Sequence, residues 1–422
     1  MSEHDETQVD LVLAKLNRPP QDPLHAAVVL EAWAGQPSAK TLDDTERMDA
    51  SRIPMMGPSL RPVPVDNLID IKEFTVLVTV LASVFLWLPA LRDLLGADSV
   101  STTMAWALPV ALAIDRGLRV RYLATGHVQT INPAMWALNG VAMAVLCTAW
   151  LISDAAQIGA SLAIIWGYAG VLAIRKWPLA YINIVITVAT WLYFDGDVVL
   201  GLTVGAVAVL AATTAAVLTT SSEQRIPEGF WITVAAAITG ASAGVLLTSE
   251  RDLWTDRSWW LGAAVLLVSL SGWWASARIT QLWVELPSQL ASVSIEDDRR
   301  QWGGLVVSSA VAGALSRVVL PTYVLLLALV VMGESGAAIL VGAFAMFSVS
   351  MLLLGLVVAT KHWFEASVAS VLAAAVAVVM PGDVTGLPML TGAAVAVLGY
   401  GAIAAIAFHN APNAFATRMI IR

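Results

Sequence analysis

Cysteine is almost missing from this sequence of 422 residues, in which Cys147 is the only one. A single cysteine cannot build an intrachain disulfide framework or a thiolate metal site. Charged side chains are also scarce, at 13% of the residues, whereas soluble domains carry about 25%. Hydrophobic residues make up 58%. This balance leaves too little polar surface for a water-soluble chain of this length, so we expect lipid to surround most of the protein.

Motifs of the common enzyme classes are missing as well. The sequence has no P-loop, no H-E-x-x-H zinc motif and no G-x-S-x-G nucleophile motif. Its five histidines are scattered, and none has a second ligand at metal-binding spacing. We therefore expect a protein that is not an enzyme and holds no cofactor or metal. The formal net charge of −8 argues against nucleic acid as a partner.

The first 70 residues form the one sizeable polar part of the sequence. Apolar residues such as Val9, Val12 and Leu16 recur there at helical spacing. This pattern predicts a small helical cytoplasmic tail over residues 1–52. Prolines recur between residues 53 and 70 and favour an extended linker. The tail is too short to bury much core alone, so contact with the membrane domain or with a protein partner through residues 1–70 is expected.

Hydrophobic segments of spanning or near-spanning length follow one another from Phe74 onward. They predict an all-α fold, a polytopic integral membrane helix bundle of about 12 transmembrane helices, although ten to thirteen would also fit. The bundle is expected over residues 71–410, with a cytoplasmic C-terminal tail at 411–422. The predicted segments are 74–91, 100–114, 131–152, 157–174, 178–194, 198–219, 229–248, 258–277, 303–332, 336–359, 364–380 and 387–408.

The distribution of basic residues predicts the orientation of this bundle. With the N-terminal tail placed in the cytoplasm, the inner loops and helix ends hold most lysines and arginines. The outer loops then hold only Arg92, Arg251 and Arg257, while acids such as Glu250 fall outside. Basic residues favour the cytoplasmic side of a membrane. We therefore expect a multi-pass protein of the cell membrane (the inner membrane of a two-membrane cell) with both termini cytoplasmic.

Tryptophan and glycine indicate how the segments meet lipid and one another. Tryptophans such as Trp87 and Trp363 lie at segment ends, which predicts an interfacial aromatic belt. Gly201-x-x-x-Gly205 and Gly240-x-x-x-Gly244 place small residues on one helix face. Such faces let two helix backbones approach closely, so we expect a tightly packed bundle.

Arg317 stands inside the longest apolar stretch, Gln301–Met332, one helical turn before Pro321. If one helix spans the whole stretch, Arg317 lies near mid-bilayer, where a charge is costly and marks a pathway or a buried partner. It would then attract an anionic substrate into a central cavity. Two alternatives stay open. Either the helix begins near Ser316 and Arg317 extends to the inner interface, or Arg317 pairs with a polar group on a neighbouring helix.

Three further polar residues complete the predicted substrate-binding set with Arg317, namely Tyr323, Asn139 and Asn183. Each lies within an apolar segment. Each could line a cavity, but the favoured interpretation for the two asparagines is a hydrogen bond between helices, which contributes about 1 kcal/mol.

A charged motif, Asp115-Arg-Gly-Leu-Arg-Val-Arg121, follows the second segment and predicts a basic inner loop. It resembles the D-R-x-G-R-R loop that major facilitator transporters carry after their second helix. The position, the side of the membrane and the number of segments fit that family. Gly117 precedes Leu118, however, whereas the family pattern puts its glycine one place later. The alternative is an ordinary basic loop that enforces topology.

Two functional hypotheses follow. The first is a transporter or flippase-like carrier for an anionic or lipid-linked substrate, because short loops, small-residue packing and an intramembrane arginine suit one. Flippases of the polysaccharide-exporter type are similar in their short loops and basic cavity residues. The alternative is a non-catalytic membrane subunit of a multi-protein assembly such as a secretion machine. In architecture the chain resembles a type VII secretion subunit, which has a small cytoplasmic domain followed by about eleven helices.

Overall fold

Every predicted hydrophobic segment contains a helix in the structure. The structure, a computed structural model, describes residues 71–123, 133–174, 177–194, 196–219, 230–250, 266–275, 296–359, 362–382 and 384–410. These residues form helices and no strand, as an all-α fold requires. They belong to one unit, Ile69–Arg422. The predicted tail (1–52), linker (53–70) and C-terminal tail (411–422) lie outside the described residues.

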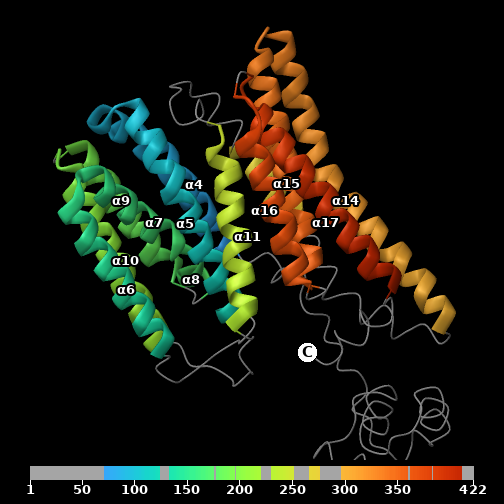
Figure 1. The fold of residues 1–422 in the computed structure, drawn as a ribbon, viewed down its shortest axis with the longest axis horizontal. Helices are drawn as coiled ribbons and strands as arrows, with labels where there is room; N and C mark the ends of the chain where they lie inside the picture. Colours follow the sequence, from blue (N-terminus) through green and yellow to red (C-terminus); the bar gives the residue numbers. More distant parts are fainter. Residues whose placement is uncertain are drawn as a thin grey trace, which may run out of the picture. The chain divides into compact units, whose positions relative to one another are not determined.

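Figure 1 shows the described helices, coloured in chain order. A further short helix, Leu266–Ala275, precedes α14. The labelled helices are α4 (Ile71–Leu95), α5 (Ala97–Leu123), α6 (Pro133–Ile152), α7 (Asp154–Gly167), α8 (Ala169–Ile174), α9 (Pro178–Phe194), α10 (Val198–Thr219), α11 (Phe230–Thr248), α14 (Glu296–Val331), α15 (Ser335–Ala359), α16 (Trp363–Val379) and α17 (Leu387–Asn410).

Eight stretches of the described helices are long and apolar enough to cross a membrane. They lie on α4, α5, α7 with α8, α10, α11, α14, α15 and α17. Shorter apolar helices occupy parts of α6, α9 and α16 and the segment Leu266–Ala275. Length and composition are therefore compatible with a multi-pass membrane protein, as the scarcity of charge predicts.

The predicted inner loop at Asp115–Arg121 is wrong, because α5 continues through it to Leu123. The segment 100–114 is thus too short by more than two turns. Charged residues are good helix formers when they pair at i, i+4, and Asp115 pairs in this way with Arg119. In the sequence, a charged helix end that lies inside the bundle has the same polar composition as a loop.

The segment 157–174, predicted as one helix, is broken at Tyr168 into α7 and α8. The backbone N–H of Tyr168 still donates to the carbonyl of Ile164, at 3.1 Å. The break lies between Gly167 and Gly170, and glycine weakens a helix interior. Both glycines are needed where they stand, because α7 and α8 press on α5 at these points.

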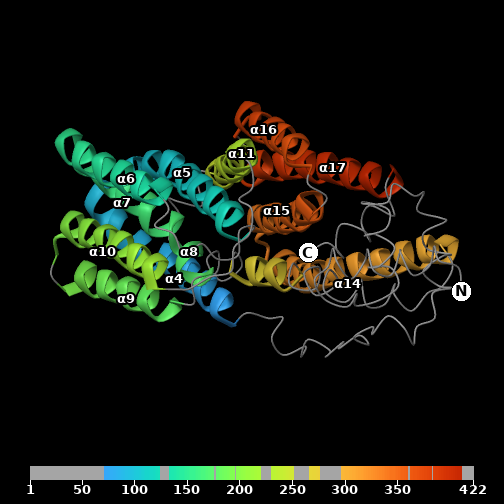
Figure 2. The same cartoon turned by 90° about the horizontal axis from the view of Figure 1, so that it is seen from below.

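Helix α5 joins two groups of helices, since it contacts α4, α7 and α8 on one side and α11, which packs on α16, on the other (Figure 2). On the α11 side a Cβ at Gly240 would collide with the carbonyl of Leu112, and one at Gly244 with the backbone of Pro109. The predicted close approach at Gly240-x-x-x-Gly244 is therefore confirmed. On the other side, a Cβ at Gly167 would lie 2.9 Å from Cβ of Ile114.

Two tryptophans assigned to the interfacial belt are instead buried, so the belt prediction is wrong for Trp87 and Trp363. Trp87 stacks on Trp166 with ring centroids 6.4 Å apart. The Nε1–H of Trp166 donates to Ser83 Oγ at 2.9 Å. Position along a segment sets the depth of an indole, but the neighbouring helix decides whether lipid reaches it.

Candidate functional site

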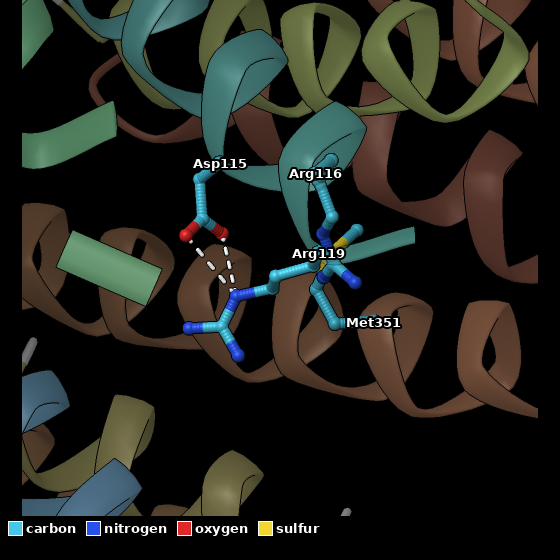
Figure 3. A network of polar contacts seen from close by, with 4 residues as sticks. All are labelled: Asp115, Arg116, Arg119 and Met351. Atoms are coloured by element: carbon cyan, nitrogen blue, oxygen red, sulfur yellow. Dashed lines mark hydrogen bonds and ion pairs between the residues drawn. The ribbon is translucent and has the colours of Figure 1, made fainter. Parts of the chain in front are cut away.

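The C-terminal turns of α5 carry a cluster of charges inside the bundle (Figure 3). Arg119 Nε donates to both carboxylate oxygens of Asp115, at 2.9 and 3.1 Å. The side chains of Arg119 and Asp115 are 31% and 17% exposed. Gly170 of α8 lies directly against them, and a Cβ there would collide with Asp115 Oδ1. The pair is thus held between α5 and α8, close enough to Tyr181 of α9 for Asp115 to interact with it electrostatically.

The side chain of Arg116 turns away from this ion pair and points toward Met351 of α15 (Figure 3). Its Nη2 donates to Sδ of Met351 on α15, at 3.5 Å. In the part of the chain that the structure describes, no carboxylate oxygen lies within 4.0 Å of this guanidinium. A thioether is a weak hydrogen-bond acceptor. Arg116 is therefore a half-buried cation without an ion-pair partner among the described residues.

Two hydroxyls complete the surroundings of Arg116. Tyr400 of α17 and Ser370 of α16 share a hydrogen bond of 2.6 Å and are both buried. Tyr400 lies close enough to Arg116 for the two to interact electrostatically. The guanidinium thus lies among α5, α15 and α17. The Ser370 hydroxyl of α16 is linked to it through Tyr400.

The direction of α5 turns this charge into a stretch that is long and apolar enough to cross a membrane. Arg116 lies seven residues before the C-terminal end of α5 at Leu123, and helix side chains lean toward the helix N-terminus. Its guanidinium therefore leans into that stretch. Met351 and Tyr400 agree with this depth, because they lie eight and ten residues before the C-terminal ends of their own helices, at Ala359 and Asn410.

The structure places the four predicted binding residues at separate positions. Arg317 on α14 is half-buried against Trp274, whereas Tyr323 on the same helix is 65% exposed. Asn139 on α6 is buried, and its Nδ2 donates to Thr214 Oγ1 of α10 at 2.8 Å. Asn183 on α9 is exposed. The favoured interpretation of Asn139 as a contact between helices is confirmed.

Sequence reasoning marked the Asp115–Arg121 motif but missed its geometry. Residues at i and i+4 share a helix face, while residues at i and i+1 are about 100° apart. Once α5 is known to continue, this spacing puts Asp115 and Arg119 on one face of the helix and Arg116 on a different face. Met351, Ser370 and Tyr400 carried no usable signal, because they come from helices more than 200 residues away along the chain.

A metal centre finds no support in the described ranges, where no three histidine, cysteine, aspartate or glutamate side chains gather to hold an ion. The arrangement can instead bind an anion, through one guanidinium and neighbouring hydroxyl groups. Comparison of the chain with protein-family models, with curated proteins and with solved structures found no match.

Proposed function

We propose that this chain is an integral membrane carrier for an anionic substrate, or for a lipid-linked substrate with an anionic group. Arg116 binds the negative charge. The observation that carries the proposal is that the Arg116 guanidinium leans into the bundle and has the Met351 thioether, rather than a carboxylate, as its hydrogen-bond partner. The orientation that goes with this proposal has both termini in the cytoplasm.

The charge balance of the site supports an anion of low charge. Arginine stays protonated in proteins, so Arg116 and Arg119 together with Asp115 carry a formal charge of +1. A buried ion without a partner costs several kcal/mol. Because Arg119 already neutralises Asp115, an anion that reaches Arg116 gains a charge-assisted hydrogen bond without breaking another ion pair.

Charge-selective labelling tests whether water and anions reach Arg116. Cys147 is first replaced by serine, and Met351→Cys then places a thiol beside the guanidinium. The thiol is labelled in sealed vesicles with a sulfonate-bearing and with a trimethylammonium-bearing methanethiosulfonate reagent. We expect the sulfonate reagent to be favoured, and Arg116→Gln to lower the ratio of the two rates by about tenfold, the effect of roughly 1.4 kcal/mol.

A matched thiol at Glu334→Cys, an exposed position in the turn between α14 and α15, controls for changes in the reagents or vesicles. Its ratio is expected to stay the same with Arg116→Gln. Absence of labelling at Met351→Cys from both sides of the membrane would contradict a carrier with this site. It would favour the alternative of a non-catalytic subunit of a multi-protein assembly.

A further inference from the structure

Arg317, the charge that stands out most in the sequence, stacks on an aromatic ring in the structure. Its Cζ lies 4.7 Å from the ring centroid of Trp274, at the end of the short helix Leu266–Ala275. Its Nη1 also donates to the carbonyl oxygen of Trp274, at 3.4 Å. A guanidinium that stacks on indole and bonds to the same residue is held in a defined orientation.

Helix direction makes the side chain of this arginine lean the opposite way, along the membrane normal, from that of Arg116. Ala314 and Val318, which flank Arg317 on α14, belong to one apolar cluster with Leu352 and Leu356 of α15. These two leucines lie within about seven residues, or roughly 10 Å, of the C-terminal end of α15 at Ala359. The side chain of Arg317 leans toward the N-terminus of α14, which begins at Glu296, so the alternative in which this helix begins near Ser316 is wrong. The guanidinium therefore leans out toward the membrane surface. This geometry supports an interfacial charge rather than one at mid-bilayer.

Trp274 reaches the same surface from the neighbouring helix. The Val268 carbonyl accepts a hydrogen bond from Ser348, whereas Ala275 belongs to an apolar cluster with Leu352 and Leu356. The short helix therefore runs in the same direction as α15. Since α15 returns antiparallel to α14 after the turn at Gly333, Trp274 lies on the side of the α14 N-terminus, where an interfacial indole is favoured.

The surroundings of the pair face outward. Trp274 is 50% exposed, and Leu320, next to Arg317 on the surface of α14, is 71% exposed. In a bilayer these apolar surfaces contact acyl chains. A cation on the headgroup side of an acyl-chain contact matches an anionic phospholipid, whose phosphate lies above its acyl chains.

We propose that Arg317 and Trp274 bind the phosphate-containing headgroup of an anionic phospholipid, in the leaflet on the side of the α14 N-terminus. The guanidinium contacts the phosphate, the indole fixes the guanidinium plane, and the α14 surface at Leu320 contacts an acyl chain. This lipid site does not depend on the transport function proposed for Arg116, which lies on another helix.

Native mass spectrometry of the full-length protein, equilibrated with phosphatidylglycerol and phosphatidylcholine, tests this site. We expect preferential retention of phosphatidylglycerol, and about a fivefold loss of retention in Arg317→Gln, the effect expected for one basic residue at a membrane surface. Trp274→Leu should lower retention less. Arg317→Lys keeps the charge but cannot stack with a planar group, so its retention should fall between wild type and Arg317→Gln.

The matched control is Arg225→Gln, which removes the same charge from a predicted inner loop. Equal losses in Arg225→Gln and Arg317→Gln would overturn the site and leave only a general attraction to anionic lipid. Unchanged retention in Arg317→Gln, or displacement of the lipid by inorganic phosphate, would also overturn it. If Arg317→Gln elutes as aggregate, the comparison of Arg317→Lys with wild type decides, and equal retention there counts against the site.

Discussion

The carboxylate of Glu250 accepts hydrogen bonds from the backbone N–H groups of Gly386 and Met389, at 2.8 and 3.0 Å. Sequence topology assigns Glu250 to an outer loop, yet the residue is buried. Gly386 and Met389 open α17, where helical N–H groups have no partner within the helix. Glu250 therefore caps the N-terminus of α17 although the two are 136 residues apart along the chain. Its negative charge also interacts favourably with the positive end of the helix dipole.

Glu250→Ala is expected to destabilise the protein by about 1–3 kcal/mol, because it leaves two buried N–H groups without acceptors. Glu250→Gln keeps one acceptor oxygen and should lose less. Thermal unfolding in detergent measures both. The control is Asp197→Ala, which removes an exposed cap from the N–H of Leu200 and should have a smaller effect. Equal shifts for Glu250→Ala and Asp197→Ala would show that burial of the glutamate adds nothing.

Gly170→Ala tests the contact between α8 and the ion pair on α5. The new methyl group would collide with Asp115, so the pair must move or α8 must shift, at a cost of about 1–3 kcal/mol. At Gly140 on α6 a Cβ meets nothing within 4 Å, and Gly140→Ala should stabilise the helix by about 0.5–1 kcal/mol. The two variants should therefore move the unfolding temperature in opposite directions, and shifts of the same sign would contradict the packing.

Gly244→Leu is expected to prevent folding, because the side chain would have to enter the backbone of α5 at Pro109. A fluorescence-detected size-exclusion profile in detergent reports the loss of the monodisperse peak. Gly355→Leu makes the same change on α15, where a Cβ meets nothing within 4 Å, and should leave the peak in place. A monodisperse Gly244→Leu protein would mean that α5 and α11 can separate.

Asn139 and Thr214 are suited to a double-mutant cycle, because the hydrogen bond between them joins α6 and α10. With Asn139→Ala, Thr214→Val and the double variant, we expect a coupling free energy of about 0.6 kcal/mol, the mean for such bonds in membranes. Asn183→Ala, at an exposed position, should show no coupling with Thr214→Val. Coupling within error of zero for Asn139 would indicate that solvent or lipid replaces the bond.

The sequence predicted the helices well because hydrophobicity and length decide where a chain can enter a membrane. Each apolar segment contains a helix, and the Gly240-x-x-x-Gly244 face packs as its small residues indicate. Errors arose at helix ends that carry charge. At Asp115–Arg121 polarity suggested a loop, whereas the i, i+4 pair inside the bundle keeps α5 helical.

The candidate site was less predictable, since its members meet only through tertiary packing. Arg116 and Met351 are 235 residues apart along the chain, and no local pattern links them. Arg317 is the more conspicuous charge in the sequence, because it interrupts a long apolar stretch. The depth of its guanidinium depends on the direction in which α14 runs and on the position of Trp274. Neither can be found until the neighbouring helices are placed.

The glycine contacts between α5 and α11 also constrain how the bundle can deform. With Gly240 at Leu112 and Gly244 at Pro109, the two backbones interlock without side chains between them, and neither helix can rotate or slide without steric overlap. The two helices therefore move together as one rigid unit. Arg116 belongs to that unit, while Met351 belongs to α15. Any change that opens the space around the guanidinium must therefore come from displacement of α15 or α17 relative to α5 and α11.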